Sequence, residues 1–351
     1  VTGVQTCALP ILKAYVNGTQ ITSFSTDNRA SLTQNTNYGI NQAALHRIGY
    51  ESATFGSTYS DFYLGEYYFI DGQALTPSSF GTTDSVTGAW IPTRYTGTYG
   101  TNGFYLPFSD NSGATATTIG KDSSGNGNNW TPSGISVTAG TTNDSLVDSP
   151  TSYGSDTGVG GEVRGNYCTI NPLRKSASIA ISNGNLYIDG NSGSVQWESI
   201  ASTFLVKTGK WYFEFLVSST YAAGNHMVGL AREDVNWSSS GQHYLTENSA
   251  TGKALDQNST TNDVVCVAFD MDLGYAWGTR NASLGTNPTN GLSPDATFST
   301  AYYWGPAFSM VCGRNNTGWA NFGQRPFAYT APSGFKALCT QNLPTPTIGL
   351  Y

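Results

Sequence analysis

Residues 209–217 read Gly-Lys-Trp-Tyr-Phe-Glu-Phe-Leu-Val. Large apolar side chains stand at every second position, and alternate side chains of a β-strand point to the same face of its sheet. The segment therefore predicts a strand with one face in a hydrophobic core. The residues expected on that face are Trp211, Phe213, Phe215 and Val217.

Further strand patterns follow this segment along the chain. Residues 226–231 form one apolar run, and residues 262–272 form a second that turns at Leu273-Gly274 into 275–278. Gly274 suits the left-handed backbone position that a short hairpin loop requires. These patterns predict antiparallel neighbours for the strand at 209–217.

The composition of the whole chain favours strands and turns. Of the 351 residues, only 11% are charged and 13% are aromatic, and 41 are glycine. Aromatic residues with glycine-rich turns are typical of β-structure, and the length allows two domains of ordinary size. The net charge of −7 comes without a basic cluster, so no nucleic-acid groove is expected. No apolar run reaches the length of a membrane span, so no membrane insertion is expected.

Four elements of the second half resemble a SPRY domain. They are the strand at 209–217, the run at 226–231, the hairpin at 262–278 and the segment 321–327, which reads Asn-Phe-Gly-Gln-Arg-Pro-Phe. The resemblance implies a SPRY-like β-sandwich over 161–343. One departure is the stretch Gly-Thr-Arg-Asn-Ala-Ser after the hairpin, where many family members have a Lys-Asn-Gly turn. We expect that departure to alter a loop and to leave the core unchanged.

The first part of the chain carries a different ordered set of signals. Residues 14–21 contain the turn pair Asn17-Gly18, and strand-like segments follow at 48–49 and 63–71. This order resembles the C-terminal half of a laminin-G-like domain. We expect a partial laminin-G-like sandwich over 12–108. The fold class predicted for the chain is therefore all-β, with two concanavalin A-like antiparallel β-sandwiches of jelly-roll type, the first incomplete.

The remaining segments are interpreted as connections and ends. Residues 1–11 resemble the translation of a sequencing adapter and no signal peptide, so we expect the protein to begin upstream and its source to be assembled environmental (metagenomic) DNA. Residues 109–160, rich in Gly, Ser, Thr and Asn, are predicted to connect the two modules. Residues 344–351 are expected to be a tail or the start of a missing region.

Two local features raise the question of metal binding or redox chemistry. The loop Asp122–Asn128 is rich in oxygen ligands and could hold calcium, but it also fits a plain turn, because Asn and Gly serve turns for other reasons. No other cofactor and no metal site are expected. Cys266 and Cys312 lie inside apolar strand patterns and are predicted to be buried free thiols.

The resemblance also implies a recognition role for loops. The insertion from Arg232 to Tyr244 falls between two predicted strands, and in SPRY domains such loops line the recognition surface. We expect Trp237, His243 and Tyr244 to bind a ligand, with simple packing of Trp237 on the sheet as the alternative. The two modules together resemble bacteriophage tail proteins. They imply a virion protein of a tail fibre or appendage, with a host-surface glycan or protein and other virion proteins as partners, in a homotrimer.

Two other function classes stay open. A glycoside hydrolase of concanavalin-like fold would need two nearby carboxyl groups. Asp270 and Asp272 have a suitable spacing, although in the family pattern they mark the end of a strand and its turn, and no catalytic residues are assigned. The second class is a purely structural virion protein. We expect a binding protein that is not an enzyme.

Overall fold

The computed structural model describes residues 12–32, 38–50, 58–86, 88–140, 142–146, 166–191, 193, 195–235, 245 and 250–343. The chain divides into two compact units. The first comprises 1–133 and 149–163, and the second comprises 134–148 and 164–351. The described residues are nearly all strand and turn, so the prediction of an all-β chain is confirmed.

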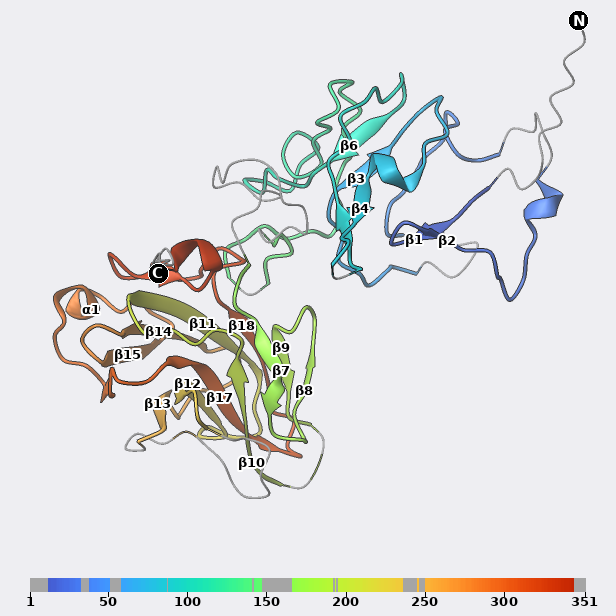
Figure 1. Cartoon of the computed structure of the whole chain (residues 1–351). Coiled ribbons are helices and arrows are strands. Elements are labelled where there is room, and N and C mark those ends of the chain that lie inside the picture. The colour runs from blue at the N-terminus through green and yellow to red at the C-terminus, as the bar shows by residue number, and fades with distance from the viewer. Residues whose placement is uncertain are drawn as a thin grey trace, which may run out of the picture. The chain divides into compact units, whose positions relative to one another are not determined.

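The second unit contains two stacked sheets (Figure 1). One sheet has five strands in the order β13-β12-β17-β10-β7, and every pairing in it is antiparallel. Its strands are β7 (Ile170–Lys175), β10 (Gln196–Ser202), β12 (His226–Arg232), β13 (Gly252–Asp256) and β17 (Trp304–Cys312).

The other sheet has eight strands, seven of them in the order β16-β15-β14-β11-β18-β9-β8. These seven pair antiparallel, and the short β19 pairs parallel with β11. The strands are β8 (Ala180–Ser182), β9 (Tyr187–Asp189), β11 (Lys210–Ser219), β14 (Val264–Asp270), β15 (Tyr275–Arg280), β16 (Ala296–Thr297), β18 (Thr317–Asn321) and β19 (Lys336–Ala337).

The core lies between these two sheets. Strand β11 turns alternate side chains into it, as its sequence predicts, and β17 and β12 supply the opposing residues. Phe215 stacks on Phe308 of β17 with ring centroids 4.7 Å apart. The buried residues from β11 are Trp211, Phe213, Phe215 and Val217. Gly274 adopts a φ of +70° in the turn between β14 and β15, so the predicted hairpin is confirmed.

Both sheets are also covered on their outer faces. The segment 327–335 packs on β11, β14 and β15, with Phe335 buried against Tyr212 and Trp277. Its backbone is held by the buried carboxylate of Glu214, which accepts hydrogen bonds from the N–H groups of Ala328 (2.9 Å) and Tyr329 (2.8 Å). Strand β11 therefore positions this covering segment through Glu214 and contributes to the core through its inward-facing side chains.

The first unit forms only two-stranded ladders among its described residues. They are β1 (Tyr15–Val16) with β2 (Thr19–Gln20), β3 (Tyr67–Phe69) with β6 (Phe104–Leu106), and β4 (Gly81–Thr83) with β5 (Trp90–Pro92). Asn17 and Gly18 take positive φ values between β1 and β2, so the predicted hairpin is confirmed. At 48–49 the structure has no named strand, only a bridge between Tyr50 and Tyr59. The laminin-G-like interpretation of 12–108 stays a prediction.

In the described part of the chain the helical segments are short. They are η1 (Arg29–Ser31), η3 (Pro77–Ser79), α1 (Asn287–Asn290) and η4 (Thr340–Asn342). Among the described residues, no helix has the length and apolar character to cross a membrane. Cys266 and Cys312 are buried free thiols, as predicted, and so are Cys168 and Cys339. The predicted connection at 109–160 is shared between the units, since 109–133 belongs to the first and 134–148 to the second.

Candidate functional site

The three residues predicted to bind a ligand, Trp237, His243 and Tyr244, lie outside the described residues. The structure does describe the residues on either side of them, Val235 and Leu245. Val235 and Leu245 both pack on the outer face of the five-stranded sheet, and the backbone N–H of Leu245 donates to the buried Ser309 hydroxyl at 3.0 Å. Val235 and Leu245 therefore both lie on that outer face.

Two exposed tyrosines and two basic side chains lie close to Val235 in the chain or in space. We call Lys207, Arg232, Tyr302 and Tyr303 the aromatic rim. The guanidinium of Arg232 lies 4.0 Å from the ring centroid of Tyr302, and the ammonium of Lys207 lies 5.2 Å from that of Tyr303. The two tyrosines are 38% and 42% exposed. Cations above the rings hold them in place while leaving contact area open to solvent.

The backbone fixes the rim from both sides. Arg232 ends β12, and the N–H of Glu233 donates to the carbonyl of Tyr303 at 3.0 Å. The Arg232 side chain also forms a bidentate pair with Asp234, at 2.6 and 2.7 Å. Arg174 of β7 donates to the carbonyl oxygens of Arg232 and Glu233, which ties the start of the segment to the sheet.

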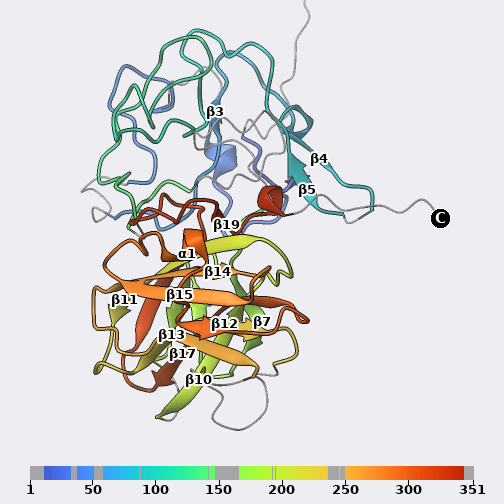
Figure 2. The ribbon, with the colours of Figure 1, turned by 90° about the vertical axis from the view of Figure 1, so that its left-hand side faces the viewer.

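A separate pocket of about 700 Å³ lies between an edge of the five-stranded sheet and an edge of the eight-stranded sheet. Strand β13 is the edge strand of the five-stranded sheet, and the short β16 pairs only with Tyr275 and Ala276 of β15. Strands β13 and β15 lie side by side (Figure 2). We call this the edge pocket. Its lining residues are Ala254, Leu255, Asp256, Gln257, Asn258, Gly278, Thr279, Arg280 and Asp295.

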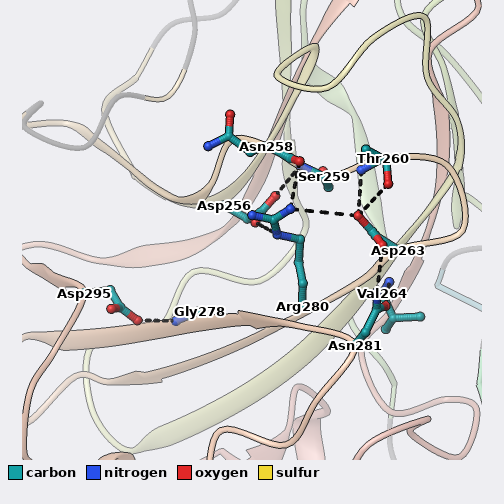
Figure 3. A network of polar contacts seen from close by, with 10 residues as sticks. All are labelled: Asp256, Asn258, Ser259, Thr260, Asp263, Val264, Gly278, Arg280, Asn281 and Asp295. Carbon is teal, nitrogen blue, oxygen red and sulfur yellow. Dashed lines mark hydrogen bonds and ion pairs between the residues drawn. The ribbon is translucent and has the colours of Figure 1, made fainter.

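Arg280 is the centre of the polar network at this pocket (Figure 3). Its Nε lies 2.6 Å from Oδ2 of Asp256, and its Nη1 donates to the carbonyl of Asn258 at 2.8 Å. The same Nη1 lies 4.0 Å from Oδ2 of Asp263. The Arg280 side chain is 39% exposed, whereas the side chains of Asp256 and Asp263 are 8% and 17% exposed. The acids therefore hold the guanidinium from behind while one side of it faces the pocket.

Asp263 belongs to the rear wall of this network. Burial raises the pKa of its carboxyl, but hydrogen bonds from Thr260 and Asn281 and the charge of Arg280 outweigh burial, and the net pKa is lowered. Asn281 donates to Oδ1 of Asp263 at 2.7 Å and accepts from the N–H of Val264 at 2.8 Å. Asp263 is therefore an anion that organises the turn after β15.

Gly278 and Asp295 define the other part of the pocket. The N–H of Gly278 donates to Oδ2 of Asp295 at 2.8 Å, as Figure 3 shows. A Cβ atom at position 278 would lie 2.5 Å from the carbonyl oxygen of Leu255, so only glycine allows β13 and β15 to approach this closely. Asp295 itself is exposed and lies beside the opening.

The carboxylates considered for hydrolysis have structural roles in the described residues. Oδ1 of Asp270 accepts from the N–H groups of Asp272 (2.9 Å) and Leu273 (3.1 Å), and Oδ2 lies 3.2 Å from the ammonium of Lys210. Asp272 accepts from the N–H of Gly209 at 3.2 Å. This confirms that the two acids mark the end of β14 and its turn.

The loop Asp122–Asn128 uses its carboxylate within the fold. Oδ1 of Asp122 accepts from the N–H groups of Tyr105 (2.9 Å) and Ser124 (2.8 Å), and Oδ2 accepts from the Ser124 hydroxyl and the N–H of Asn128, both at 2.9 Å. The amide of Asn126 donates to the carbonyl of Gly103 at 2.8 Å. The geometry favours the turn interpretation over calcium. No group of three or more His, Cys, Asp or Glu side chains suited to a metal occurs in the part of the chain that the structure describes.

Comparison with known proteins gives a fold likeness only. No family model matches the chain, and no curated protein matches it. Among solved structures, it is similar to the SPRY domain of human HERC1, with 16% identity over 43% of this chain and 96% of that chain and a TM-score of 0.32. It is also similar to the PSpry domain of TRIM65, with 12% identity over 44% of this chain and 90% of that chain and a TM-score of 0.33. A third similar structure is that of stonustoxin, with 16% identity over 44% of this chain and 27% of that chain and a TM-score of 0.31. Likenesses of this size do not tell what the chain binds.

Proposed function

We propose that the second unit is a non-catalytic binding module of a bacteriophage virion protein, part of a tail fibre or appendage. It attaches to a glycan or protein on the host surface. The observation that carries the binding role is the aromatic rim, where two exposed tyrosine rings are each fixed by a cation. The rim includes Arg232, at the start of the insertion in which the sequence predicts Trp237, His243 and Tyr244 to bind a ligand.

The rim suits binding because it lowers the entropy lost when a contact surface becomes ordered. A side chain that is already held in one conformation loses little entropy when a ligand arrives, and tyrosine offers both an apolar ring and a hydroxyl. Tyr303 directly precedes β17 and Arg232 ends β12, so rigid sheet supports the rim. Loops on such a scaffold are where recognition residues are usually found.

The virion assignment rests on the sequence resemblances. The laminin-G-like order in the first unit, the SPRY-like elements in the second and the stretch 122–130 are typical of phage tail proteins. The module then acts on the outside of a particle, alongside other virion proteins and as part of a homotrimer. A purely structural virion protein is the alternative, and a glycoside hydrolase is less favoured because Asp270 and Asp272 both bind backbone N–H groups.

The experiment that tests the binding role uses the full chain, fluorescently labelled, on an array of bacterial surface glycans and on a panel of bacterial cells. The test variant is Tyr302→Ala with Tyr303→Ala. The matched control is Tyr221→Ala, because Tyr221 is also an exposed tyrosine with a cation, Arg314, 4.3 Å from its ring centroid.

We expect the wild-type chain to bind a subset of glycans or cells and the double variant to lose at least tenfold in affinity, with the control unchanged. Removing two aromatic contacts of about 1 kcal/mol each accounts for such a loss. Absence of binding to every glycan and every cell type would favour the structural alternative. Equal binding by the wild type and the double variant would remove the rim from the site.

A further inference from the structure

We propose that the edge pocket is a binding site for one neutral sugar residue, distinct from the aromatic rim. The register of β12 with β13 separates the two places, because Val228 pairs with Asp256 whereas Ala231 pairs with Gly252. The rim lies at the Arg232 end of β12, and the Asp256–Arg280 network lies at the other end. The proposal goes beyond the rim's role and does not depend on it.

The shape of the pocket suits a small ligand with one apolar face. Its volume of about 700 Å³ falls within the range of small-molecule sites. Most of the lining is polar, and a small apolar part lies at Ala254, Leu255 and Gly278, where β13 and β15 approach. A pyranose ring presents C–H groups on one face and hydroxyls around its edge. The C–H face can lie on this apolar part.

The polar groups around the wall offer both donors and acceptors. The exposed side of the Arg280 guanidinium and the amide of Gln257 can donate, while the exposed carboxylate of Asp295 can accept. Neighbouring hydroxyls of a sugar each need a donor and an acceptor, so a mixed lining matches them better than a lining of one kind. Arg280 is held from behind by Asp256 and by the carbonyl of Asn258, so its open side is in place before a ligand binds.

The charges argue against an ionic ligand. Two carboxylates and one guanidinium line the pocket, and a third carboxylate, Asp263, lies behind the guanidinium. An anion would meet this excess of negative charge. A metal cation would meet Arg280, which is fixed between the acids that would have to coordinate it. A ligand without charge avoids both penalties.

The test is ligand-observed NMR on the full chain with the methyl glycosides of galactose, glucose, mannose, rhamnose and N-acetylglucosamine as probes. N-acetylneuraminic acid serves as an anionic probe. The variants are Asp295→Asn, which keeps an acceptor for the N–H of Gly278 but removes the charge, and Gln257→Ala. The matched control is Asp272→Asn, because Asp272 is also an exposed aspartate that accepts one backbone N–H.

We expect at least one neutral glycoside to bind with a dissociation constant in the millimolar range, as a single sugar with few contacts should. Asp295→Asn should weaken it by about tenfold, because a hydrogen bond to a charged acceptor becomes one to a neutral acceptor. Asp272→Asn should leave it unchanged. The proposal is overturned if no neutral glycoside binds, if N-acetylneuraminic acid binds as tightly, or if the rim variant alone abolishes binding. Loss of glycan-array binding in the rim variant, with glycoside binding intact, would separate the two sites.

Discussion

The Nε atom of Arg280 lies 2.6 Å from Oδ2 of Asp256, and this ion pair joins β15 of the eight-stranded sheet to β13, the edge strand of the five-stranded sheet. It joins two strands that belong to different sheets and that have no β-pairing with each other in the described residues. Asp256 is 8% exposed and Arg280 is 39% exposed, so solvent screens the pair only in part.

A double-mutant cycle should measure this connection. We expect the variants Arg280→Gln and Asp256→Asn, compared with the double variant in chemical denaturation, to show a coupling free energy of about 1 kcal/mol. The coupling should shrink in high salt, because one partner is partly exposed. A coupling indistinguishable from zero at low salt would mean that the pair does not hold the two sheet edges together.

The buried imidazole of His226 should make the second unit sensitive to mild acid. Burial lowers its pKa to about 4, while in the unfolded chain the ordinary value of about 6.5 applies. Between these values the unfolded chain binds more protons, so the free energy of unfolding should fall as the pH drops from about 6.5 to about 4, by about 3 kcal/mol at most. Thermal unfolding across this range measures it.

The control for this effect is the exposed His46. The variant His226→Leu should flatten the pH dependence between 4 and 6.5, whereas His46→Leu should leave it as in the wild type. An unchanged slope in His226→Leu would assign the acid sensitivity to other groups.

Glu214 should contribute more to the free energy of unfolding than an ordinary surface acid does. Its side chain is fully buried, and its carboxylate accepts hydrogen bonds from two backbone N–H groups and from the Tyr212 hydroxyl. Glu214→Gln places an amide N–H₂ where one of those donors points. We expect a loss of about 2 kcal/mol in the free energy of unfolding. The exposed Glu233→Gln should change it by less than about 0.5 kcal/mol. Hydrogen exchange at Ala328 and Tyr329 would locate the effect, and slow exchange there in Glu214→Gln would contradict it.

The loop Asp122–Asn128 should hold its shape without metal. Its carboxylate already accepts four hydrogen bonds, three of them from backbone N–H groups. Adding calcium or a chelator should therefore leave the unfolding temperature of the chain unchanged, while Asp122→Ala should lower the stability of the first unit by about 2 kcal/mol. A rise in unfolding temperature with calcium that disappears in Asp122→Ala would show instead that the loop binds the ion.

Local alternation was sufficient to predict the core of the second unit. Trp211, Phe213 and Phe215 all point inward, and the turn at Gly274 lies where its sequence predicts. The alternation and the turn each involve residues only a few positions apart, so both can be predicted from one sequence. The ladders of the first unit are shorter than expected, since only Tyr67–Phe69 of the predicted strand at 63–71 forms one.

The edge pocket, in contrast, could not be predicted from the spacing of its residues along the chain. Asp256, Asp263 and Arg280 are separated along the chain and meet only because β13 and β15 lie at facing sheet edges. One signal for the pocket is the stretch Thr279-Arg280-Asn281 after the hairpin, where many SPRY domains have a Lys-Asn-Gly turn. The sequence alone predicts that this difference alters only a loop. The structure shows that Arg280 ends β15 and that Asn281, with a φ of +53°, begins the turn and holds Asp263.

The most direct test of the central claim, that this sandwich binds without catalysing, is one incubation of the full chain with the bacterial glycans that it retains on the array. Bound ligand and released reducing ends are measured in the same sample. We predict saturable binding that Tyr302→Ala with Tyr303→Ala weakens at least tenfold, with no increase in reducing ends over time. Steady release of reducing ends, or no retention of any glycan or cell, would contradict it.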